Sequence, residues 1–167
     1  MTVVAVRARV GGMSTHAPST IEHASAVAVD GRAILIYGPS GCGKSDLALR
    51  LIDRGARLIA DDRTVLRRAG EAVLASPPET IAGLIEVRGL GVVAAPGAAT
   101  AADAFPVALA VRLVADPAEV VRMPDPASRD VLGVAVPELT LWGFAASAAA
   151  VVTVALDAAL DRREVRR

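Results

Sequence analysis

The sequence contains the octapeptide Gly38-Pro39-Ser40-Gly41-Cys42-Gly43-Lys44-Ser45, which fits the phosphate-binding pattern G-x-x-x-x-G-K-[ST] at every fixed position. An apolar run at 33–37 precedes it and predicts a buried parallel strand. Residues 46–54 follow it and predict a helix, which Gly55 would end. The motif therefore stands between a strand and a helix, which is the context that a phosphate-binding loop requires.

The residue types of this loop suit the binding of a nucleotide polyphosphate. Its glycines let the backbone turn tightly and approach a ligand, and the N–H groups of the loop and first helical turn then point at an anion. Lys44 can reach the β- and γ-phosphates, and the Ser45 hydroxyl can take Mg²⁺. We therefore predict ATP and Mg²⁺ as cofactors, with all eight residues of the octapeptide in the nucleotide site. The alternative is a glycine-rich turn that binds no ligand.

Composition narrows the class of protein. The 167 residues suit one domain, and 53% hydrophobic with only 2% aromatic residues implies an aliphatic core. Basic and acidic side chains number 18 each, so the formal net charge of +0 does not favour a nucleic-acid partner. No apolar run reaches the roughly 18 uninterrupted residues that a membrane span needs. We expect neither a nucleic-acid nor a membrane partner.

Cys42 is the only cysteine of the chain, so no internal disulfide is possible. This agrees with a reducing environment, and we expect a cytoplasmic protein. The electropositive loop around Cys42 could lower the pKa of its thiol and make it a redox switch. The alternative is a small residue that fills a variable position of the loop.

The remaining pattern predicts an α/β fold with more strands than helices. The predicted strands are 21–29, 58–60, 105–114 and 131–136, with hairpins at Asp30-Gly31 and across 65–74. Helices are predicted at 79–84 and 147–163, and a mobile loop at 116–130. We expect a single P-loop domain at 21–167 with a mixed, strand-rich sheet and few helices, preceded by an extension or linker at 1–20.

Further polar residues surround the loop in the sequence. Asp61 and Asp62 end an apolar strand, where a metal-facing or base carboxylate belongs in such proteins, although an Asp pair there can also be a cap or turn. Glu86 and Arg88 lie two residues apart, so they share a strand face and could instead form a surface salt bridge. His23 lies upstream, near a strand start, where a structural or surface role is the alternative.

Together these residues resemble the catalytic domain of the HPr kinase/phosphorylase family over Ile21 to Gly91. The matching segments are His23 with Val27-Ala28-Val29-Asp30, the loop ending Gly43-Lys44-Ser45, Arg54-Gly55-Ala56-Arg57-Leu58-Ile59-Ala60-Asp61-Asp62, and Leu84-Ile85-Glu86-Val87-Arg88-Gly89-Leu90-Gly91. The resemblance implies the HPr kinase/PEP carboxykinase-like fold. It also implies a truncated form that consists of the catalytic domain and lacks the N-terminal domain of longer members.

The resemblance implies roles for the site residues. Ser45 and Glu86 would hold the divalent metal, and Asp62 would be the general base for the target serine. Lys44 and His23 match active-site positions of the family. A further catalytic arginine is expected in the second half, where Arg122 is the nearest candidate and Arg129 the next.

The function that the resemblance implies is an ATP-dependent serine kinase acting on the phosphocarrier HPr or a related carrier of the phosphotransferase system. It further implies phosphorolysis of the phosphoserine and assembly as a homohexamer. Two alternatives stay open. One is a P-loop NTP hydrolase in which Asp62 or Glu86 positions water, and the other is a nucleotide-dependent regulatory binding module without catalysis.

Overall fold

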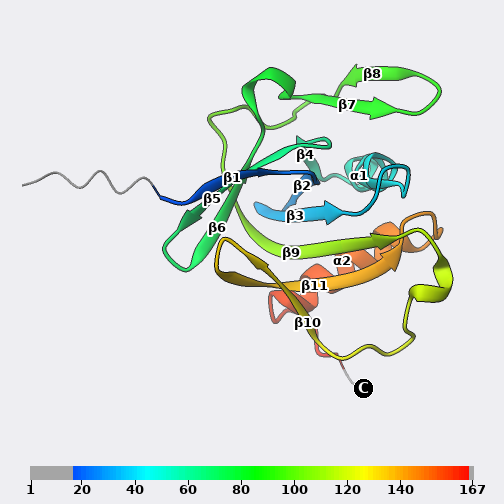
Figure 1. Ribbon diagram of the computed structural model, residues 1–167. Helices are drawn as coiled ribbons and strands as arrows, with labels where there is room; N and C mark the ends of the chain where they lie inside the picture. The colour runs from blue at the N-terminus through cyan, green and yellow to red at the C-terminus, as the bar shows by residue number, and fades with distance from the viewer. Residues whose placement is uncertain (1–16, 166–167) are drawn as a thin grey trace, which may run out of the picture.

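Figure 1 shows the computed structural model, which describes residues 17–165 of the chain. In chain order the elements are β1 (Ser19–Glu22), β2 (Ser25–Val29), β3 (Arg32–Tyr37), α1 (Lys44–Asp53), β4 (Arg57–Ala60), β5 (Thr64–Ala69), β6 (Ala72–Ser76), η1 (Glu79–Ile81), β7 (Leu84–Val87), β8 (Gly91–Ala94), β9 (Phe105–Val114), η2 (Pro117–Glu119), β10 (Ala127–Val131), β11 (Val134–Trp142) and α2 (Ala148–Ala159). This order confirms the predicted mixed, strand-rich α/β class.

One curved sheet contains most of these strands, in the order β1-β5-β6-β9-β3-β2-β4, with β11 paired to β9 and β10 to β11. The strands β3, β9 and β11 are mutually parallel, and β4 runs the same way because β2 is antiparallel to both β3 and β4. The carboxyl ends of these four strands therefore meet at one edge of the sheet, which is where ligands bind in open α/β sheets.

The core has two parts because side chains alternate along each strand. On β3, Ile34 and Ile36 face the side of the sheet that α1 and α2 cover. Leu35 and Tyr37 face the opposite side, where they belong to a second core cluster with residues of β5, β6, β10 and β11. Figure 1 shows α2 behind β9 and β11, and the hairpin of β7 and β8 apart from the main sheet. In the part of the chain that the structure describes, no helix is long and apolar enough to cross a membrane.

The strand predicted over 21–29 is wrong as a single element. The chain turns at His23-Ala24, where the Ala24 N–H donates to the Glu22 carbonyl at 3.0 Å. This turn separates β1, which pairs with β5, from β2, which pairs with β3 and β4. The tight hairpin at Asp30-Gly31 is confirmed, since both residues have positive φ (49° and 73°), as a type I′ turn requires.

Local pattern also misplaced elements elsewhere. The end of the predicted loop 116–130 lies in β10, which runs to Val131, and the predicted strand 131–136 is interrupted by the turn into β11. The helix predicted at 79–84 is the single turn η1 followed by β7. The first strand, β1, begins at Ser19, within the predicted extension, while residues 1–16 lie outside the described residues. The division into an extension and a catalytic domain stays a prediction.

The packing of α2 predicts different costs for two adjacent valines. Val152 is fully buried against the sheet, whereas Val151 is exposed on the same helix. Val152→Ala should lower the free energy of unfolding by about 2 kcal/mol, because two methylene equivalents are lost and a cavity is left. Val151→Ala, the matched control, should change it by less than about 0.5 kcal/mol. Urea unfolding measures both, and equal losses would contradict this packing.

Candidate functional site

The phosphate loop joins the carboxyl end of β3 to α1, which begins at Lys44. Gly43 caps this helix with φ 96°, a left-handed conformation that favours glycine. A pocket of about 420 Å³ lies against the loop. It is lined by Ser40, Gly41, Gly43, Lys44, Ser45, Asp46, Leu49, Asp62, Glu86, Val87, Arg88 and Phe144. The first helical turn leaves N–H groups without helical partners here, which favours an anion.

Lys44 is buried at the base of this pocket. Its Nζ donates to the Gly38 carbonyl at 3.1 Å and to the Pro39 carbonyl at 3.4 Å. The same Nζ lies 3.8 Å from Oδ1 of Asp62. The ammonium group is thus held between the loop and a carboxylate, and it presents positive charge where phosphates would lie.

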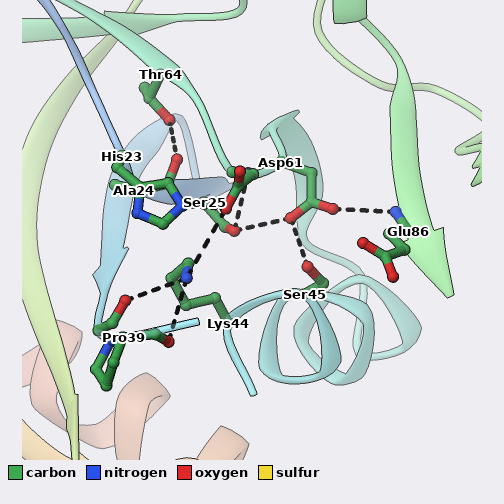
Figure 2. A network of polar contacts seen from close by, with 11 residues as sticks. His23, Ala24, Ser25, Pro39, Lys44, Ser45, Asp61, Thr64 and Glu86 are labelled. Carbon is green, nitrogen blue, oxygen red and sulfur yellow. Dashed lines mark hydrogen bonds and ion pairs between the residues drawn. The ribbon is translucent and has the colours of Figure 1, made fainter. Parts of the chain in front are cut away.

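The Asp61 carboxylate accepts hydrogen bonds from three elements, β2, α1 and β7, as Figure 2 shows. Its Oδ1 accepts hydrogen bonds from the hydroxyls of Ser25 and Ser45, each at 2.8 Å, and its Oδ2 accepts from the Glu86 N–H at 3.0 Å. Asp61 and Ser25 are buried, so these bonds replace the solvation that the carboxylate loses. Asp61 therefore sets where the Ser45 hydroxyl and the start of the Glu86 side chain lie.

Asp62 points to a different part of the site than Asp61. Its φ of 64° is left-handed, which turns its side chain away from that of its neighbour. Its Oδ1 lies 2.5 Å from Nε2 of His23, and its N–H donates to the Ser25 hydroxyl at 3.2 Å. The side chains of Asp62 and His23 are 60% and 57% exposed. This pair can therefore meet a large ligand at the mouth of the pocket.

The donor set fits a hard divalent cation. Ser45 and Glu86 line the same pocket and offer a hydroxyl and a carboxylate, which are oxygen ligands that Mg²⁺ prefers. Within the described residues the Glu86 carboxylate makes no hydrogen bond or ion pair, and no group of three or more His, Cys, Asp or Glu side chains is gathered as a dedicated cage. A site completed by phosphate oxygens is the arrangement that Mg²⁺ usually takes.

Comparison with known proteins identifies the family and the fold of this chain. A family model described as HPr Serine kinase C-terminal domain matches residues 14–164. The chain belongs to this family. A solved structure, the Hpr(Ser) kinase/phosphatase from Coxiella burnetii, superposes with a TM-score of 0.73 and 26% identity over 85% of this chain and 97% of that one. The HPr kinase-like fold that the resemblance implied is thus confirmed.

Curated relatives carry the name HPr kinase/phosphorylase. That of Geobacillus sp. (strain WCH70) is 50% identical over 78 residues, and that of Clostridium tetani (strain Massachusetts / E88) is 46% identical over 80 residues. The matches cover 46% and 48% of this chain but 25% and 26% of the relatives. The chain thus spans about a quarter of the length of the curated relatives it matches.

The structure brings together most of the predicted site residues of this HPr serine kinase family member, but not all. His23, Lys44 and Asp62 converge, and Ser45 and Glu86 line the pocket beside them. Glu86 and Arg88 both line the pocket and form no ion pair with each other, so the surface salt bridge considered above does not form.

Neither candidate arginine of the second half lines this pocket. Arg122 is exposed in the loop between η2 and β10 and has no hydrogen bond or ion pair with other described residues. The Arg129 guanidinium lies 4.1 Å from the Tyr37 ring centre, and its Nε lies 2.5 Å from the Glu138 carboxylate. The catalytic role of Arg122 stays a prediction.

Sequence reasoning missed two residues of the site. Ser25 bridges the two aspartates, but a serine within an apolar strand carries no local signal of that role. Phe144 lines the pocket although it lies far along the chain from the loop. The strand prediction ended at residue 136, whereas β11 runs to Trp142 and places Phe144 just beyond its end, so the local pattern carried no signal of this role.

The contrast between the two aspartates predicts a contrast in stability. Asp61→Asn should lower the free energy of unfolding by about 1–3 kcal/mol, because the amide nitrogen cannot accept one of the three hydrogen bonds that the buried carboxylate accepts. Asp62→Asn should cost less than about 1 kcal/mol, since its ion pair with His23 is exposed. Chemical denaturation measures both variants. A larger loss for Asp62→Asn would refute the structural role of Asp61.

A low-pKa redox thiol at position 42 is not what the structure shows. Burial raises the pKa of the Cys42 thiol above its ordinary value, and Lys44 offsets only part of this. A raised pKa means less thiolate at neutral pH, so the native protein should react with iodoacetamide at least tenfold more slowly than the urea-unfolded chain. Because Cys42 is the only cysteine, mass spectrometry reads the reaction directly. Equal rates at neutral pH would contradict the burial.

Proposed function

We propose that this chain is a protein-serine kinase that transfers the γ-phosphoryl group of ATP to a serine of HPr or a related phosphocarrier. The observation that carries this proposal is the Asp62 carboxylate. It is exposed at the mouth of the phosphate-loop pocket and lies 3.8 Å from the Lys44 ammonium group. A carboxylate in this position lies beside the expected phosphates and is open to an incoming hydroxyl.

In the proposed reaction the loop binds and orients the triphosphate. Backbone N–H groups of the first turn of α1 hold the phosphate oxygens, and Lys44 places its charge near the transferred group. Lys44 would exchange its bonds with the Gly38 and Pro39 carbonyls for bonds with phosphate oxygens. The charge is preorganised because the lysine is already buried at the base of the pocket.

Asp62 acts as the general base. It takes the proton from the serine hydroxyl as the serine oxygen forms a bond to the γ-phosphorus, and the bond from that phosphorus to the β,γ-bridging oxygen breaks. The electron pair of the broken bond leaves with ADP. His23, whose Nε2 lies 2.5 Å from Oδ1 of the same carboxylate, holds Asp62 in place.

Ser45 and Glu86 would hold Mg²⁺ in this reaction. The ion, when bound, neutralises charge on the phosphates. The Ser45 hydroxyl is already oriented by its bond to Asp61, and the Glu86 carboxylate has no other partner among the described residues. A hydroxyl and a carboxylate of this kind support the expectation of a divalent ion in the pocket.

The openness of the site supports a protein substrate. A serine on a folded carrier reaches only a group that is exposed, and more than half of the Asp62 and His23 side chains is exposed. The reverse reaction is part of the proposal: inorganic phosphate attacks the phosphoserine, Asp62 returns the proton to the serine, and pyrophosphate forms. The homohexamer expected from the resemblance also stays a prediction.

The proposal is tested by incubating the protein with γ-labelled ATP, Mg²⁺ and HPr-type phosphocarriers, and then measuring acid-stable phosphoserine. Label on a carrier serine that is lost on adding excess phosphate, with pyrophosphate formed, supports both directions. Phosphate release without labelled carrier would point to an NTP hydrolase. ATP binding with neither result would point to a regulatory binding module.

Asp62→Asn should separate binding from chemistry. The variant should bind ATP within about twofold of the parent, because the phosphate contacts come from the loop and Lys44. Transfer to the carrier should fall by about 10²–10⁴-fold, since the amide cannot accept the serine proton. Asp30→Asn, in the exposed turn between β2 and β3, is the matched control and should transfer normally. Transfer by Asp62→Asn near the parental rate would refute the base assignment.

A further inference from the structure

Two aromatic side chains lie together at the phosphate loop of a chain that has few of them. The sequence has one tryptophan, one tyrosine and two phenylalanines. Trp142 ends β11, and Phe144 follows in the loop to α2, with ring centres 6.0 Å apart and planes at 71°. Phe144 is 47% exposed and lines the phosphate-loop pocket. A large apolar side chain exposed in a ligand pocket indicates a contact with the ligand.

The loop that carries Phe144 is held against the phosphate loop. The Arg50 guanidinium, on α1, donates to the carbonyls of Gly143 and Ala145 and pairs with Asp46 at 2.8 Å. Gly143 permits this approach, because a Cβ there would lie 2.6 Å from the Cys42 carbonyl oxygen. The position of the loop is therefore fixed by contacts with α1 and with the phosphate loop itself.

The Phe144 ring rests on the end of the phosphate loop. A Cβ on Gly43 would meet the ring at 3.0 Å, so the ring edge packs on this glycine. Leu49, one helical turn beyond Ser45, forms a second apolar part of the pocket wall. The pocket thus has a polar part at the start of α1 and an apolar part formed by Phe144 and Leu49, which is the division that a nucleotide has between its phosphates and its base.

We propose that Phe144 is the stacking surface for the base of the bound nucleotide. This inference rests on the proposed function, since it concerns the same pocket. Base stacking on an aromatic ring contributes about five- to 150-fold in affinity, and it tolerates any base because each base has a π-face. The phosphate loop supplies the contacts to the phosphates, and Phe144 makes the site prefer a nucleotide over a polyphosphate that has no base.

The test compares ADP with pyrophosphate, which shares its diphosphate but has no base. Isothermal titration with Mg²⁺ measures both ligands on the parent and on Phe144→Ala. The variant should bind ADP about tenfold more weakly and bind pyrophosphate unchanged. Phe144→Tyr keeps the ring and should bind ADP normally, and Val151→Ala, a remote exposed substitution on α2, should change neither affinity.

A second readout detects stacking directly. On binding to the parent, the adenine H2 and H8 resonances of ADP should shift upfield through the ring current of Phe144, and this shift should disappear in Phe144→Ala. If Phe144→Ala lost equal affinity for ADP and for pyrophosphate, the inference would be overturned, because the ring would then only support the loop at Gly43. An ADP affinity of Phe144→Ala equal to that of the parent would overturn the stacking inference as well.

Failure of the proposed function gives a different pattern. A parent protein that binds neither ADP nor pyrophosphate would remove both the nucleotide site and the stacking inference. A parent protein that binds ADP with the Phe144 dependence described, but labels no carrier, would refute the kinase proposal and support the stacking inference.

Discussion

The buried Asp61 carboxylate is the constraint on which the site depends. Three donors from three different elements reach it: the Ser25 hydroxyl of β2, the Ser45 hydroxyl of α1 and the Glu86 N–H of β7. A buried carboxylate is costly unless such bonds replace water, so the three elements are held at fixed positions around it. The hairpin of β7 and β8 is not part of the main sheet. The Glu86 N–H ties it to Asp61, whose other carboxylate oxygen accepts from Ser45 of α1.

The turn after β4 gives two adjacent carboxylates different surroundings. Asp61 is buried and satisfied by three donors, while Asp62, in a left-handed conformation, is exposed and pairs with His23 and Lys44. Ser25 contacts both, because its hydroxyl donates to Asp61 and accepts from the Asp62 N–H. Asp61 thus holds the elements of the site in position, while Asp62 remains exposed to an incoming ligand.

Sequence predicted the parts of the fold that local pattern specifies. The motif fixed the turn between β3 and α1, and the apolar run before it gave β3. The prediction from sequence failed where pairing between distant segments decides the structure. The polar segment of β10 is a strand only because it pairs with β11, and β1 separates from β2 because it pairs with β5 instead. Among the site residues, Lys44 and Ser45 followed from the motif, and the roles of His23, Asp62 and Glu86 from the family resemblance. The local pattern around Ser25 and Phe144 does not indicate that the fold brings them to the pocket.

The exposure of the proposed base has a chemical consequence. Water reaches Asp62 as readily as a serine hydroxyl does, because the side chain is 60% exposed. Exclusion of water therefore cannot be what favours transfer over hydrolysis in the resting pocket. In the proposed kinase reaction the preference for transfer comes from positioning, because the serine of a docked carrier is held beside the phosphate at a high effective concentration that water cannot match in orientation. On this proposal, the Ser45 and Glu86 positions fixed by Asp61 belong to the nucleotide side of the site, and the docked carrier supplies the serine beside Asp62.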